Sequence, residues 1–175
     1  MRSRVAEVVL LFASVTSACS PVLDWREVRL QGTTLTTLFP CRPAGQARRL
    51  VLAGADVEMM LHACTGDGVV YAVGFADVLQ PARVGPALAE LRQAAARNLG
   101  AQLGNVLDPA QVPGATPNAQ AGRATLSGVL SDGRAVQETI AVFARGTWVY
   151  QAMVLGASPS AEARESFFAS LRFSE

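Results

Sequence analysis

The chain has 175 residues, of which 50% are hydrophobic and 17% are charged. This balance is typical of a globular protein and excludes an intrinsically disordered chain. The 15 basic residues, all of them arginine, nearly offset the 14 acidic ones. A chain without a strong positive charge lacks the electrostatic footprint of a nucleic-acid-binding protein, so we expect no nucleic-acid partner.

The first residues have the pattern of a targeting segment. Arg2 and Arg4 precede a short apolar run over residues 8–13, and small residues then lead to Cys19. The run is much shorter than the roughly 20 apolar residues of a membrane-spanning helix. The segment resembles a bacterial lipoprotein signal, in which the cysteine is lipidated, although Thr16 stands where that signal usually has leucine.

The resemblance implies a signal peptide over residues 1–18, a lipidated tether over residues 19–23 and a single domain over residues 24–175. It places the protein in the cell envelope, anchored to a membrane by the lipid on Cys19 and facing the periplasm. Ser20 is not acidic, which by the same resemblance favours the outer membrane. Two alternatives stay open: an ordinary secretory signal cut after Ala18 without a lipid, and a buried N-terminal helix of a cytosolic protein.

The remaining two cysteines, Cys41 and Cys64, form an even pair. In an oxidising compartment such a pair predicts a disulfide, and two free thiols are the alternative. We expect no metal site, because two cysteines and the single histidine, His62, lack close ligand spacing and a fourth partner. The chain carries no phosphate-binding loop and no dinucleotide-binding motif, so we expect no cofactor.

The first half of the chain predicts strands. Turn-forming residues separate runs that are rich in β-branched and aromatic side chains. The predicted strands cover residues 24–30, 33–39, 48–53, 56–64 and 69–78, with a hairpin about Gly54 and a turn over residues 65–68. Both faces of these runs are largely apolar, which indicates a sheet covered on both sides.

A long helix is predicted from Pro81. Its apolar residues recur at helical spacing and form one face, which we expect to lie on the sheet; they are Val84, Leu88, Leu91, Ala95 and Leu99. Gly100 is typical of a helix end. Arg92 and Arg97 are expected in water.

The second half predicts a long irregular stretch over residues 104–122, then three strands and a helix. The strands cover residues 123–130, 134–143 and 147–155, and Ser158–Pro159 is expected to cap the helix. Phe167, Phe168 and Leu171 are expected to dock this helix on the sheet. The predicted fold is therefore α+β, with an antiparallel sheet of about six or seven strands flanked by one long and one C-terminal helix.

This order of elements resembles an uncharacterised lipoprotein family of proteobacterial type with a PsbP-like (DcrB-like) fold. The resemblance covers Trp25 to Phe173. It is carried by Asp24–Glu27, Leu38–Pro43, Pro81–Val84, Gly146–Gln151 and Phe167–Leu171. It implies an antiparallel sheet flanked by helices and no catalytic residue. Members of the fold serve mainly as binding or assembly accessories.

The functional prediction is a non-enzymatic accessory or interaction module of the envelope, with another envelope protein or a small ligand as its partner. Trp148 and Tyr150 share a strand face and are the candidate binding surface. One alternative is a carrier of small apolar ligands, which needs an apolar pocket between helix and sheet. The other is an envelope enzyme that uses His62, paired with Cys64 on the same strand face.

Overall fold

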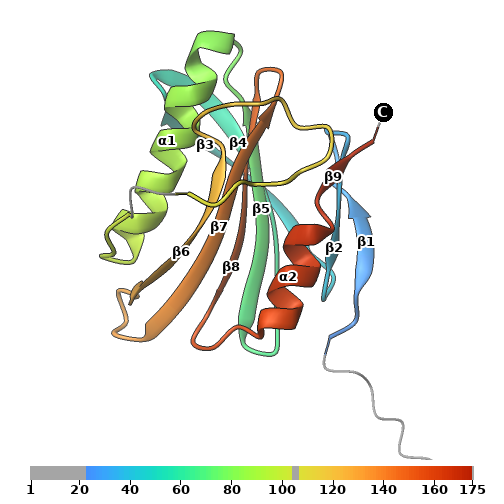
Figure 1. Cartoon of the computed structure of the whole chain (residues 1–175), viewed down its shortest axis with the longest axis vertical. Coiled ribbons are helices and arrows are strands. Elements are labelled where there is room, and N and C mark those ends of the chain that lie inside the picture. The colour runs from blue at the N-terminus through green and yellow to red at the C-terminus, as the bar shows by residue number, and fades with distance from the viewer. Residues whose placement is uncertain (1–22, 104–106, 175) are drawn as a thin grey trace, which may run out of the picture.

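A six-stranded antiparallel sheet forms the centre of the molecule (Figure 1). The computed structural model describes residues 23–103 and 107–174. Across the sheet the strands follow the order β3 (Ala44–Leu52), β4 (Ala55–Gly66), β5 (Val69–Asp77), β8 (Trp148–Gly156), β7 (Ala135–Arg145) and β6 (Gly122–Val129). The α+β class and the antiparallel pairing are as the sequence predicted.

The large sheet has six strands, in line with the predicted six or seven, but the first two strands of the chain do not join it and belong to a second sheet of three strands. β1 (Arg26–Arg29) pairs with β2 (Leu35–Phe39), and β2 pairs with the short C-terminal strand β9 (Arg172–Phe173). Leu30, Leu35 and Phe39 are fully buried against the large sheet. The small sheet therefore covers one face of the large sheet and does not extend it.

Two tight turns define the register of β3, β4 and β5. The turns Ala53–Gly54 and Asp67–Gly68 have positive φ at both residues, the backbone form whose twist matches that of a two-residue hairpin. The hairpin about Gly54 is confirmed. Thr65, expected in a turn, belongs to β4 instead, because the two-residue turn at Asp67–Gly68 lets the pairing continue to Gly66.

Helix α1 (Pro81–Asn98) lies on the other face of the large sheet, against β7 and β8 (Figure 1). All five residues of its predicted apolar face are buried, so this prediction is confirmed. Gly100 follows with a φ of 60°, a conformation that favours glycine. Arg92 was expected in water, but it is partly buried. Its Nη2 donates to Gln120 Oε1 at 2.6 Å, and its Nε is buried.

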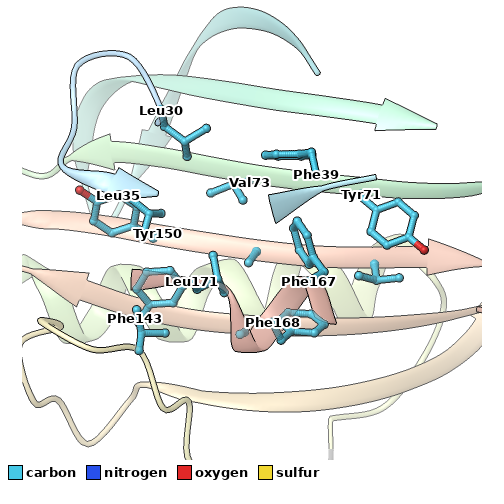
Figure 2. Packing of buried hydrophobic residues seen from close by; sticks show 14 of the residues in the cluster. Leu30, Leu35, Phe39, Tyr71, Val73, Phe143, Tyr150, Phe167, Phe168 and Leu171 are labelled. Atoms are coloured by element: carbon cyan, nitrogen blue, oxygen red, sulfur yellow. The ribbon is translucent and has the colours of Figure 1, made fainter. Parts of the chain in front are cut away.

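Helix α2 (Ala161–Ala169) packs on the same face of the large sheet as β1 and β2, and Figure 2 shows the side chains that meet there. Phe167, Phe168 and Leu171 are buried as predicted. The start of α2 differs from the prediction. Ser160, not Ser158–Pro159, caps the helix, because its hydroxyl accepts a hydrogen bond from the Ala163 amide at 3.3 Å.

The segment 107–121, predicted to be irregular, packs over β6 and β7. It forms isolated backbone pairings, Asp108 with Arg123 and Thr116 with Ala144, and Val112 is only 9% exposed. Gly122, expected at the end of the irregular stretch, opens β6. Residues 104–106 of the stretch lie outside the described residues.

The predicted disulfide is present. Cys41 and Cys64 are bonded, with their Cα atoms 5.9 Å apart. Cys41 follows β2 and Cys64 lies in β4, so the bond ties the small sheet to the large one. Cys19 and the signal segment 1–18 lie outside the described residues. Within residues 23–103 and 107–174 there is no helix with the length and hydropathy of a membrane span, and no cluster of metal-ligating side chains.

Candidate functional site

A cleft opens where two turns meet, between the β1–β2 turn and the β7–β8 hairpin. Its volume is about 660 Å³, within the roughly 300–1,000 Å³ of small-molecule sites. The described residues that line it are Arg29, Leu30, Gln31, Gly32, Thr33, Thr34, Arg145, Trp148 and Tyr150. The cleft therefore contains both members of the predicted binding surface, Trp148 and Tyr150.

The β7–β8 hairpin aligns three of these side chains. Arg145 and Trp148 are directly opposite each other across the tight turn at Gly146–Thr147. Tyr150 lies two residues further along β8 and so shares the face of Trp148. The hairpin therefore presents a cation, an indole and a phenol on one surface.

Arg145 is held in one orientation by neighbours from the two ends of the chain. Its Nη1 donates to Thr34 Oγ1 at 3.2 Å and to the Ser174 carbonyl oxygen at 3.0 Å. Its guanidinium carbon lies 5.1 Å from the centre of the Phe173 ring, within the range of a cation–π contact. These contacts fix the guanidinium at the edge of the cleft.

The aromatic wall of the cleft is rigid. Tyr150 is 3% exposed and stacks on Phe143, with 5.3 Å between ring centres. Burial raises the pKa of Tyr150 to about 12, so its hydroxyl stays protonated at neutral pH. Figure 2 shows this hydroxyl directed toward the β1–β2 turn. Trp148 is only half-buried, with its ring centre 6.0 Å from that of Phe75, and offers its remaining surface to the cleft.

The opposite wall is a turn that its own hydrogen bonds stabilise. Thr33 Oγ1 donates to the Leu30 carbonyl oxygen at 3.2 Å and accepts from the Leu35 amide at 3.0 Å. Gly32 has a φ of 84°, which a residue with a Cβ rarely adopts. Leu30 is fully buried and anchors the turn in the core. The turn is a fixed part of the site.

The described lining of the cleft carries two arginines and no carboxylate. The ion pairs among the described residues involve neither Arg29 nor Arg145. Asp77 lies on β5 opposite Trp148, and its Oδ1 accepts a hydrogen bond from the Leu79 amide at 2.8 Å. The cleft therefore has a positive charge and a partly apolar wall.

His62 lies away from this cleft, on β4. Its ring stacks on Phe75, with 5.9 Å between ring centres, and its Nε2 is buried without a partner among the described residues. Burial lowers the pKa of His62, which favours the neutral ring. The sulfur of Cys64 is bonded to Cys41, so the pairing of His62 with a free Cys64 thiol is not available in this oxidised form.

Side chains fill the contact between α1 and the sheet, where an apolar carrier would hold its ligand. Val84, Ala87 and Leu88 pack there against Val142 and Val149, and all five are buried. Two smaller cavities, of about 360 and 280 Å³, lie along the segment 107–121 on the opposite face of the sheet.

Sequence reasoning missed Arg145, Arg29 and the β1–β2 turn as parts of the site. A signal for Arg145 was present, because residues that flank a two-residue turn face each other, and Trp148 follows Gly146–Thr147. The approach of the β1–β2 turn has no such local signal, since it depends on how the two sheets pack. Comparisons with protein-family models, with curated proteins and with solved structures found no match.

Proposed function

We propose that this protein is a non-enzymatic binding accessory of the bacterial cell envelope, anchored by a lipid on Cys19, and that it holds a small ligand in the cleft between the β1–β2 turn and the β7–β8 hairpin. One observation carries the proposal: Arg145, Trp148 and Tyr150 converge on a cavity of about 660 Å³. Both walls are fixed by packing and hydrogen bonds, so the site is preformed.

The envelope location has support from the disulfide between Cys41 and Cys64. Disulfides persist in oxidising compartments such as the periplasm and are rare in the cytosol. In a lipoprotein with Cys19 as its lipidated first residue, only Cys41 and Cys64 would carry no lipid, and the bond uses both of them. The outer membrane, facing the periplasm, remains the proposed location.

The arrangement of sheet and helices is consistent with the family resemblance. An antiparallel sheet with α1 on one face and α2 on the other is what a PsbP-like fold implies. We retain membership of such a lipoprotein family as part of the proposal.

The non-enzymatic part rests on the surroundings of the only histidine. Acid–base or nucleophilic catalysis needs a group that a substrate reaches, with an orienting partner. His62 instead stacks on Phe75, and the thiol it would activate is bonded to Cys41. Tyr150 stays protonated at neutral pH, which suits binding more than proton transfer.

Photochemical labelling in living cells tests the binding function. A photoreactive amino acid at Gln31, exposed on the rim of the cleft, should give a discrete added mass on the purified protein after irradiation. The same amino acid at Arg134, exposed near the other end of β7, serves as the control. Equal labelling at the two positions, or none at Gln31, would contradict a ligand in the cleft.

A further inference from the structure

We infer that the cleft takes a small anionic ligand, with its carboxylate or phosphate group on Arg145 and a flat apolar body against Trp148. The inference rests on the proposed function, because it names the ligand class for the same cleft. It goes beyond that function because a binding accessory can hold neutral, cationic or anionic ligands.

Arg145 has the geometry of an anion receptor. Its contacts with Thr34 and Ser174 both use Nη1, and Phe173 lies against the guanidinium. Among the described residues no oxygen accepts a hydrogen bond from its Nε or Nη2. A guanidinium presents these donors in a planar fork, which matches the two oxygens of a carboxylate or phosphate. The side chain of Arg145 is thus already oriented, and its Nε and Nη2 donors remain available to a ligand.

The charges around the cleft favour an anion over a neutral ligand. Arg29 adds a second positive charge at the rim, and no described carboxylate lines the cleft. Asp77, on the neighbouring strand opposite Trp148, acts on Tyr150 with one negative charge, which offsets only part of the charge of the two arginines. The aromatic side chains of Trp148 and Tyr150 exclude water from one side, which strengthens the attraction between a guanidinium and an anion.

The size of the cleft indicates that the ligand is more than an inorganic ion. A phosphate or acetate ion fills only a small part of about 660 Å³. The half-buried ring of Trp148 offers a stacking surface beside Arg145. These features fit a carboxylate or phosphate that is attached to a flat body.

Tryptophan fluorescence measures such binding directly, because the chain has two tryptophans and one lies in the cleft. Trp25→Phe leaves Trp148 as the only reporter and keeps a ring beside Tyr71. The purified protein is titrated with benzoate, phenyl phosphate, the neutral analogue benzyl alcohol and inorganic phosphate. We expect saturable changes with benzoate or phenyl phosphate, and at least tenfold weaker binding of benzyl alcohol and inorganic phosphate. Preference for benzoate indicates a carboxylate ligand, and preference for phenyl phosphate indicates a phosphate ligand.

Variants show whether Arg145 carries the recognition. Arg145→Gln should weaken binding of the preferred anion by about tenfold or more, since a lost charge-assisted hydrogen bond corresponds to such a factor. Arg145→Lys keeps the charge without the fork and should recover only part of the affinity. Arg29→Glu changes an exposed side chain and should also weaken binding, which provides a test if Arg145→Gln does not fold. Arg134→Gln, on a distant exposed arginine, is the matched control and should bind as the Trp25→Phe parent does.

Benzyl alcohol binding as tightly as the anions would overturn the inference. Unchanged affinity in folded Arg145→Gln would overturn it too, as would unchanged affinity in Arg29→Glu if Arg145→Gln does not fold. Failure of every probe to bind would overturn it as well. None of these results would contradict the proposed function. That function is tested separately, because labelling at Gln31 detects any ligand in the cleft, charged or neutral.

Discussion

Glu138 should make the protein less stable as the pH rises toward neutrality. The residue lies in β7 on the face that α1 covers, between Leu126 of β6 and Leu155 of β8. It is 5% exposed, and burial raises its pKa from 4.5 to about 7. Removing a carboxylate from water disfavours its charged form, so the folded chain binds this proton more tightly than the unfolded chain does.

The sign and size of the effect follow from these two pKa values. Below pH 4.5 the carboxyl of Glu138 is protonated in both states and has no effect on stability. Between pH 4.5 and about 7 the unfolded chain loses the proton first, so the free energy of unfolding falls with rising pH. Above that range the full deficit is reached. At 1.36 kcal/mol per pKa unit this deficit in the free energy of unfolding amounts to about 3 kcal/mol.

Glu138→Gln removes the ionisation while keeping the shape of the side chain. Urea denaturation followed by circular dichroism, at intervals between pH 4 and 8, should show a decline in stability for the wild-type protein that the variant lacks. Hydrogen bonds from Arg123 and Arg134 lower the pKa values of Glu165 and Asp132, respectively. These two carboxylates affect the pH dependence of both proteins equally, so their effects cancel in the comparison. Glu58→Gln, on an exposed carboxylate, is the control and should keep the wild-type profile. Parallel profiles for wild type and Glu138→Gln would refute the reasoning.

Three further predictions concern the disulfide, the core and the anchor. The double variant Cys41→Ser/Cys64→Ser should lose about 3 kcal/mol of stability, since the bond closes a loop with a sequence separation of 23, and should still fold; an unchanged urea midpoint would contradict this. Leu88→Ala, at a fully buried position, should cost about 2–5 kcal/mol, whereas the exposed Gln93→Ala should cost under about 0.5 kcal/mol; similar melting temperatures for the two would show that α1 is not part of the core. Cys19→Ala should move the protein from the membrane fraction to the soluble fraction or stall its processing; equal partitioning with wild type would remove the lipid anchor.

Much of the large sheet could be predicted because its pairings, apart from that of β5 with β8, are hairpins between consecutive strands. Each hairpin has turn residues at its tip, as at Gly54 and Asp67–Gly68, and the apolar spacing of α1 indicated its buried face. The separate small sheet could not be predicted in this way. Its strand β2 pairs with β9 near the other end of the chain, and a pairing so distant in sequence leaves no periodic signal in either strand.

The candidate site shows the same division. Trp148 and Tyr150 were accessible to sequence reasoning, because alternate residues of a strand share a face. The contacts of Arg145 with Thr34 and Ser174 were not, since they join segments from opposite ends of the chain. Glu138 also escaped prediction. A single charged residue in a strand is ordinarily solvent-exposed, and the apolar side chains that cover this part of the sheet, such as Leu99 and Leu126, come from other elements.

The bond between Cys41 and Cys64 also determines how the chain responds to a mechanical pull on its N-terminal end. Such a force first separates β1 from β2 and then β2 from β9, because these short strands lead from that end. At Cys41 the tension passes through the covalent bond to Cys64, near the end of β4, and from there along the chain to β5, which is paired along both sides. Residues 42–63 lie within the bonded loop and bear no tension; they include the edge strand β3 and β4 up to Ala63. Extension from this end should therefore stop at the small sheet until β5 is torn from β4 and β8.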